Sequence, residues 1–80
     1  KPVFRLGKEK SYADYFIGDN PAVSRSHADV ISRDGRFYVT DLNSRNRTYL
    51  NGQAIPVQVE TELRDGDTLR LGNEEFVFYI

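Results

Sequence analysis

The chain has 80 residues, which is enough for one domain but not for two, since compact domains usually contain roughly 50 to 250 residues. Its 39% share of hydrophobic residues suffices for a small core and argues against a disordered chain. With no Cys, one His and a net charge of −1, the chain is a poor candidate for a disulfide scaffold, a structural zinc site, or a nucleic-acid or membrane binder.

Turn-forming dipeptides recur along the chain and separate short runs rich in β-branched and aromatic residues. The dipeptides are Asn20-Pro21, Asp34-Gly35, Asn51-Gly52, Asp65-Gly66 and Gly72-Asn73. The runs between them suit pleated strands, and apolar residues nowhere recur at helical spacing over the length of a convincing helix. The sequence therefore predicts an all-β fold, either a β-sandwich or a small barrel.

In the first half of the chain, two segments lack the alternation of strands, namely residues 8–14 and 18–27. Residues 28–33 and 36–40 then form the clearest predicted hairpin, because they flank the Asp34-Gly35 turn. Residues 42–47 are a third irregular segment. We expect the irregular segments to be loops, where the binding residues of β scaffolds concentrate.

The second half is predicted to contain a hairpin centred on Asn51-Gly52 and three further strands. Apolar and polar residues alternate over residues 57–63 and again over 68–71, as in half-buried strands. The last run, residues 75–80, carries apolar side chains on both of its faces. We therefore expect both faces of this last strand to be covered.

The three irregular segments are rich in cations and in short hydroxyl and amide side chains. Residues 1–47 hold nine Lys or Arg against six Asp or Glu, whereas residues 48–80 hold two against six. The polar loop residues are Lys8, Lys10, Ser24, Arg25, Ser26, His27, Ser44, Arg45, Asn46, Arg47 and Thr48. Such donors suit a compact anion, and a phosphorylated side chain fits them better than a carboxylate, because it has three acceptor oxygens. Ordinary solvated loop residues are the competing interpretation.

The order and spacing of these motifs resemble a forkhead-associated (FHA) domain over nearly the whole chain. The motifs are Phe4-Arg5-Leu6-Gly7-Lys8, Asp14, Val23-Ser24-Arg25-Ser26-His27-Ala28, Asp41-Leu42-Asn43-Ser44-Arg45-Asn46-Arg47-Thr48, Asn51-Gly52 and residues 63–72. The resemblance implies an all-β fold, an 11-strand β-sandwich of two mostly antiparallel sheets, that binds a phosphothreonine peptide at the loops of one end. It also implies that residues 1–80 are a single FHA-like domain that begins at about the third strand of the family pattern, as a fragment of a longer multidomain protein.

The resemblance also implies a role for each motif residue. The implied phosphate contacts are Ser24, Arg25, Arg45 and Lys8. The implied peptide contacts are Asn46 and Arg47, and the implied supports of the site are His27 and Gly7. Two positions depart from the family pattern, since Lys8 replaces an Arg and Arg47 replaces a Gly. Lys8 offers a point charge in place of a forked contact, and Arg47 is expected to need an unfavourable backbone angle.

Several alternatives remain beside a phosphothreonine reader that recruits a protein phosphorylated by a Ser/Thr kinase. The main one is a module of the same fold that binds an unphosphorylated partner or dimerises. Catalysis is disfavoured because the chain has no nucleophile motif and little room to enclose a substrate. A calcium loop is excluded, because Asn46 and Gly52 occupy positions that need Gly and Glu. We expect no cofactor, metal, nucleic acid or membrane partner and a cytoplasmic location; the oligomeric state is left open.

Overall fold

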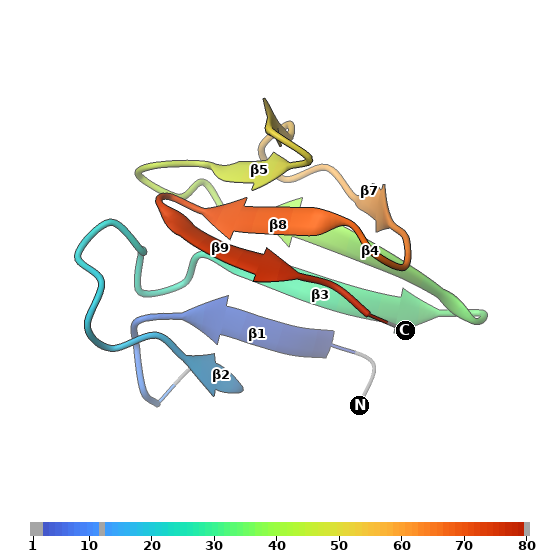
Figure 1. Ribbon diagram of the computed structural model, residues 1–80. Helices are drawn as coiled ribbons and strands as arrows, with labels where there is room; N and C mark the ends of the chain where they lie inside the picture. The colour runs from blue at the N-terminus through green and yellow to red at the C-terminus, as the bar shows by residue number, and fades with distance from the viewer. Residues whose placement is uncertain (1–2, 12, 80) are drawn as a thin grey trace.

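The computed structural model describes residues 3–11 and 13–79, and within these ranges the chain forms nine strands and no helix (Figure 1). One sheet has five strands, in the order β2 (Tyr15–Phe16), β1 (Val3–Gly7), β3 (Ala28–Arg33), β4 (Arg36–Asp41) and β7 (Thr61–Leu63). The other has four, in the order β6 (Gln53–Ala54), β5 (Thr48–Leu50), β8 (Thr68–Leu71) and β9 (Glu74–Val77).

All neighbouring strands are antiparallel except β1 and β2, which pair in parallel. The predicted β-sandwich of two mostly antiparallel sheets is therefore confirmed. In the described part of the chain, no helix is long and apolar enough to cross a membrane.

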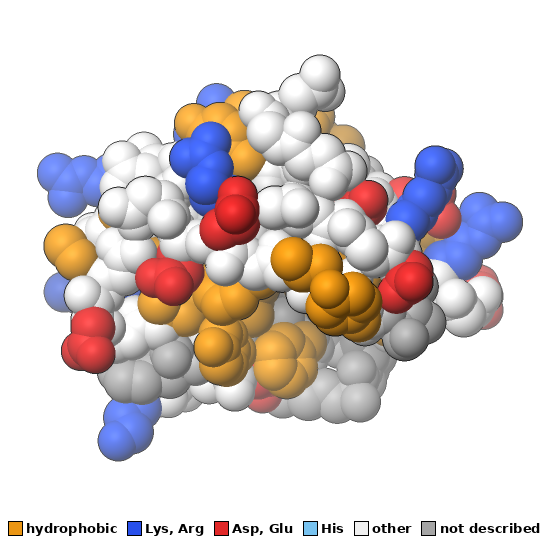
Figure 2. Space-filling model, viewed as in Figure 1, with side chains coloured by type: hydrophobic (Ala, Val, Ile, Leu, Met, Phe, Trp, Pro, Cys, Tyr) orange, Lys and Arg blue, Asp and Glu red, His pale blue; other side chains and the backbone are white. Residues whose placement is uncertain are grey.

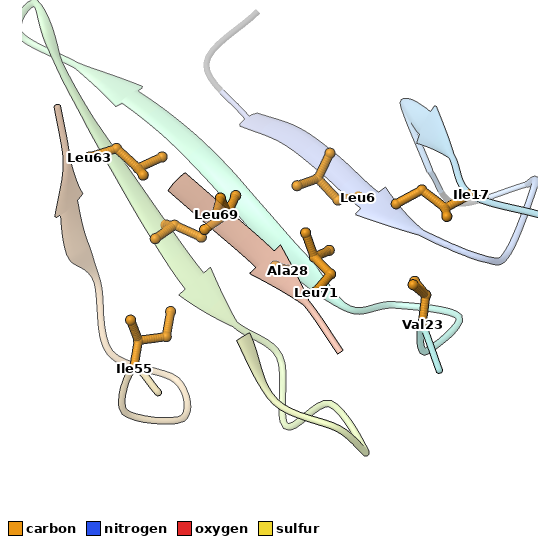
Figure 3. Packing of buried hydrophobic residues seen from close by; sticks show 9 residues of the cluster. Leu6, Ile17, Val23, Ala28, Ile55, Leu63, Leu69 and Leu71 are labelled. Carbon is orange, nitrogen blue, oxygen red and sulfur yellow. The ribbon is translucent and has the colours of Figure 1, made fainter. Parts of the chain in front are cut away.

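The core lies between the two sheets and is made of aliphatic side chains. The buried hydrophobic residues are Leu6, Ile17, Val23, Ala28, Val39, Ile55, Leu63, Leu69 and Leu71 (Figure 3). Leu69 and Leu71 alternate with exposed or half-buried positions on β8, as period two requires. Each fully buried Leu or Val contributes about 1.5–3 kcal/mol. Val23 and Ile17 extend this core under the loop that carries Ser24, which anchors that loop to the sandwich.

Both predicted hairpins are confirmed. Asp34 and Gly35 have φ values of 53° and 76° between β3 and β4, and Asn51 and Gly52 have 50° and 85° between β5 and β6. Two consecutive positive φ angles are typical of tight hairpin turns, and Asn, Asp and Gly tolerate them best. The dipeptides therefore fix the register of both hairpins.

The prediction of one continuous strand over residues 57–63 is wrong, because only Thr61–Leu63 form a strand. Val57 makes an isolated bridge with Asp41, and Gln58 has a φ of 63° that no regular strand can accommodate. The short strand β2 was not predicted from the sequence.

The expectation that both faces of the last strand are covered is also wrong. β9 ends at Val77, and the exposed fractions of Val77 and Tyr79 are 49% and 74%. Ile80 lies outside the described residues. Within the described chain β9 pairs with β8 alone, so its other edge is unpaired.

An apolar groove adjoins this edge, where β9 passes β1. It has a volume of about 380 Å³ and is lined by Phe4, Leu6, Tyr15, Val30, Phe37, Leu69, Phe76, Val77 and Phe78. Figure 2 shows hydrophobic side chains gathered on this face of the molecule. Two of these lining residues, Phe37 and Phe78, pack edge to face with their ring centroids 5.4 Å apart.

Candidate anion-binding site

The loops that follow β1, β2 and β4 meet at one end of the sandwich (Figure 1). The backbone N–H of Lys8 donates to the carbonyl of Ser24 at 3.0 Å, which joins the first loop to the second. The backbone N–H of Arg45 donates to Ser24 Oγ at 3.0 Å, which joins the third loop to the second. Ser24 is therefore the point at which all three loops are connected.

An open pocket of about 500 Å³ lies at this junction. It is lined by Lys8, Pro21, Val23, Ser24, Arg25, Ser26 and Arg45. The structure thus brings together all four residues that the sequence analysis assigned to phosphate. No acidic residue is among the described residues that line the pocket, whereas three are cations. Hydroxyl and cationic donors without a competing carboxylate favour an anion.

His27 holds the Ser24 loop from behind. The backbone N–H of Ser24 donates to His27 Nδ1 at 3.0 Å, and Nε2 donates to the carbonyl of Arg47 at 2.9 Å. The imidazole is therefore neutral, with its proton on Nε2. The side chain is fully buried, and this burial lowers its pKa against the opposing effects of the Arg47 carbonyl and the Asp41 carboxylate.

Gly7 allows the first loop to approach the second. A Cβ atom at this position would lie 2.0 Å from the carbonyl oxygen of Arg25, so a larger residue would push the two segments apart. The backbone N–H of His27 also donates to the carbonyl of Leu6, at 3.1 Å. This close approach explains why a glycine occupies position 7. A positive φ angle does not explain it, because the φ of Gly7 is not positive.

Asp41 fixes the third loop through a buried network. Its carboxylate accepts hydrogen bonds from the hydroxyl and the backbone N–H of Ser44, the latter at 3.1 Å, and from Thr48 Oγ1 at 2.6 Å. Burial opposes ionisation of Asp41, but these hydrogen bonds and nearby His27 hold its pKa below its usual value. The supporting role of Asp41 was not predicted from the sequence, although an Asp three residues before a Ser is a common local loop motif.

Asn46 and Arg47 are not among the residues that line the pocket. Asn46 Nδ2 donates to the carbonyl of Ala22 at 2.9 Å. Arg47 has a φ of 67°, in line with the unfavourable angle expected from its sequence position. Its Nη2 donates to the carbonyl of Ile55 at 2.7 Å, so its guanidinium points toward the segment after β6. In the described chain its buried Nε has no hydrogen-bond partner.

The family model for the FHA domain matches residues 4–72. The chain belongs to the FHA domain family. The oxoglutarate dehydrogenase inhibitor of Corynebacterium diphtheriae is 38% identical over 98% of this chain and 51% of that protein. The glycogen accumulation regulator GarA of Mycolicibacterium smegmatis is 36% identical over 98% of this chain and 46% of that protein. This FHA domain thus spans about half the length of these relatives.

Solved FHA structures superpose closely on this domain. Mycobacterium tuberculosis EmbR, in complex with a low-affinity phosphopeptide, has a TM-score of 0.89 and 29% identity over 99% of this chain and 20% of that chain. The N-terminal FHA domain of Saccharomyces cerevisiae Rad53p, in complex with a phosphothreonine peptide, has a TM-score of 0.80 and 27% identity over 91% of this chain and 61% of that chain.

Proposed function

We propose that this FHA domain is a non-catalytic module that binds a phosphothreonine peptide and so recruits a protein phosphorylated by a Ser/Thr kinase. The observation that carries the proposal is the convergence of Lys8, Ser24, Arg25 and Arg45 on one pocket without an acidic lining residue in the described chain. The phosphopeptides named with EmbR and with Rad53p support the same class of ligand.

Ser24 is set up to donate to a phosphate oxygen. Its Oγ already accepts the N–H of Arg45, so its own hydroxyl proton is directed elsewhere. A phosphothreonine carries about −1.5 to −2 charges at neutral pH and three acceptor oxygens. Lys8, Arg25 and Arg45 supply the positive charge around these oxygens. Hydrogen bonds between charged groups and phosphate are stronger than neutral ones, so the phosphate dominates recognition.

Asn46 is proposed to hold the main chain of the bound peptide. One hydrogen of its amide is donated to the carbonyl of Ala22, which fixes the side chain beside the pocket. The remaining amide hydrogen and Oδ1 can pair with a peptide N–H and C=O. Arg47 Nη2 donates to the carbonyl of Ile55, so the proposed peptide contact of Arg47 would use the other N–H groups of its guanidinium.

We further propose that the domain is one module of a longer protein, in which strands preceding residue 1 cover the apolar groove. Two observations support this proposal: among the described strands β9 has no neighbour on its outer edge, and the side chains of Phe4, Tyr15 and Val77 are exposed. The chain also covers only 78% and 79% of two solved FHA chains, which leaves about a fifth of each unmatched. An added strand would pair with β9 and place apolar side chains in the groove.

The proposed function is tested by titration with three forms of one peptide library, containing phosphothreonine, phosphoserine or unmodified threonine. We expect the phosphothreonine form to bind most tightly and the unmodified form to show no binding. Equal binding of all three forms would instead favour a module that recognises an unphosphorylated partner.

A further inference from the structure

Asn20 connects the wall of the phosphate pocket to the turn between β8 and β9. Its Nδ2 donates to Asn73 Oδ1 at 2.6 Å and to Glu74 Oε1 at 2.8 Å. Its Oδ1 accepts the backbone N–H of Ala22 at 2.9 Å, and its carbonyl accepts the N–H of Val23 at 3.1 Å. The half-buried side-chain amide of Asn20 therefore shapes the segment 20–23. It also connects this segment to Asn73 and Glu74, which lie 53 and 54 positions further along the chain.

The segment 20–23, which Asn20 connects to the β8–β9 turn, forms part of the pocket wall. Pro21 and Val23 line it, and Ser24 follows directly. Ala22 between them is held on two further sides. Asn46 donates to its carbonyl oxygen, and a Cβ atom at Gly72 would lie 2.6 Å from that oxygen. The β8–β9 turn therefore packs against the main chain of Ala22, just before Ser24.

The same turn is connected to Ser24 by a second route. The N–H of Gly72 donates to the carbonyl of Arg47 at 2.9 Å, and this carbonyl also accepts His27 Nε2. His27 Nδ1 in turn accepts the N–H of Ser24. Asn20 thus closes a ring of contacts that runs from the β8–β9 turn through His27 to Ser24 and back.

We propose that Asn20 is a positioning residue for phosphopeptide binding, which acts through the placement of Ser24 and of the pocket wall without contacting the ligand. This inference rests on the proposed function. Position 20 needs a side chain that both donates and accepts hydrogen bonds. The amide nitrogen of Asn20 faces two acceptors, and its oxygen faces one donor. An Asp has no donor for Asn73 or Glu74, and it would place a second carboxylate beside that of Glu74.

The hydrogen bond between residues 20 and 74 can be tested by exchanging its donor and its acceptor. In Asn20→Asp the contact with Glu74 becomes repulsive, and the loop is expected to move away from the β8–β9 turn. In Asn20→Asp combined with Glu74→Gln, the amide of the new Gln can donate to the new carboxylate, so the connection is restored with donor and acceptor exchanged. Glu74→Gln alone keeps an oxygen that accepts from Asn20 and should bind like the wild type.

Asn51 supplies a matched control at another turn. Its Nδ2 donates to Asp67 Oδ1 at 3.0 Å and its Oδ1 accepts the N–H of Thr68 at 2.9 Å. Asn51→Asp therefore makes the same chemical change beside an acidic partner, in the turn between β5 and β6. It should lower the thermal midpoint of unfolding as Asn20→Asp does, but it should leave phosphopeptide affinity within about twofold of the wild type, since no pocket residue is displaced.

The experiment measures the phosphothreonine-peptide affinity of these variants at a temperature where all are folded. Asn20→Asp should bind about fivefold to tenfold more weakly, the equivalent of about one lost hydrogen bond, and the double variant should return to within about twofold. Affinity of Asn20→Asp equal to that of Asn51→Asp, or no recovery in the double variant, would overturn the proposal. If Asn20→Asp does not fold, Asn20→Ala takes its place and should show the same fivefold loss.

A second readout needs no ligand. The amide hydrogen of Ser24 should exchange with solvent faster in Asn20→Asp than in the wild type, and it should be protected again in the double variant. Unchanged exchange would refute the coupling between Asn20 and Ser24 even if the wild type binds phosphopeptide. If the wild type binds none, the proposed function fails, and the role of Asn20 in binding fails with it.

Discussion

The hydroxyl oxygen of Ser24 accepts the backbone N–H of Arg45 across 3.0 Å, although the two residues are 21 positions apart in the sequence. This hydrogen bond places the hydroxyl group and the Arg45 main chain at one pocket, so the third loop cannot move without affecting Ser24. The geometry of the pocket thus depends on contacts between loops as much as on the side chains that line it.

Substitution Ser24→Ala should abolish most phosphopeptide binding. It removes the proposed donor to the phosphate and also leaves the N–H of Arg45 without its acceptor. A hydrogen bond to a charged group is worth about 1.5–3 kcal/mol, which corresponds to roughly tenfold to a hundredfold in affinity. Isothermal titration with a phosphothreonine peptide measures the loss. Ser32→Ala, in β3, is the control and should bind normally; wild-type affinity in Ser24→Ala would remove Ser24 from the site.

Substitution Lys8→Arg should strengthen phosphopeptide binding. Lys8 lines the pocket, and a guanidinium would add a forked contact where the ammonium is a point charge. We expect a gain of roughly threefold to tenfold in affinity, because two parallel charge-assisted hydrogen bonds replace one. Lys10→Arg, at an exposed position of the same loop, should have no effect. Weaker binding in Lys8→Arg would indicate that the pocket is shaped for the ammonium.

Two substitutions of Arg47 measure how much its positive φ angle lowers the stability of the domain. Arg47→Gly and Arg47→Ala both remove the hydrogen bond to Ile55, so their difference reports on the main chain alone. With a φ of 67°, Gly should be more stable than Ala here by about 1 kcal/mol, the reverse of the usual order. Urea unfolding of both variants measures this difference. Greater stability of the Ala variant would show that the left-handed conformation is not retained.

The stability of the domain should fall in two steps as the pH falls. Burial lowers the pKa of His27 from 6.5, so the unfolded state takes up the proton first and the free energy of unfolding decreases below about pH 6.5. The pKa of Asp41 is lowered from 3.8 in the folded state, so a further loss begins below that value as its carboxylate is protonated. Chemical denaturation across this range measures both steps.

His27→Gln identifies the first step, because its side chain does not titrate. Its free energy of unfolding should be nearly independent of pH between about pH 7 and pH 5, apart from the small contributions of exposed carboxylates. A slope equal to that of the wild type would mean that another group is responsible.

The apolar groove predicts self-association of the isolated 80-residue chain. The side chain of Val77 is 49% exposed on a strand edge that no other described strand pairs with, and such edges readily pair with a second copy. Val77→Lys should shift sedimentation toward the monomer at concentrations where the wild type associates. Glu75→Gln, on the same strand, serves as the control for a changed charge. A wild-type chain that stays monomeric at every concentration would contradict this prediction.

The sequence predicted the two hairpins correctly, because their turn dipeptides determine where the chain reverses. Asp34-Gly35 and Asn51-Gly52 need positive φ angles, and few other dipeptides supply them. The alternation over residues 57–63 predicted a strand that is longer than the observed β7, because Gln58 takes a left-handed φ and interrupts the extended main chain. A period of two in the sequence reports which side chains could share a face, and it does not report the φ angles between them.

The candidate site was predictable in its parts but not in its connections. Ser24, Arg25 and Arg45 were assigned to phosphate from the resemblance to FHA domains, and the structure gathers them at one pocket. Asn20 was interpreted only as a turn residue beside Pro21, since its acceptors lie more than 50 positions further along the chain. Such long-range hydrogen bonds leave no local pattern in a single sequence.

The first and second loops of the site are joined through main-chain atoms, by hydrogen bonds from Lys8 N to Ser24 O and from Glu9 N to Arg25 O. The side chains of Lys8, Arg25 and Arg45 contribute no atom to these joints. Exchange of these three side chains should therefore change which ligand the pocket selects, while the hydrogen bonds between the first and second loops stay in place.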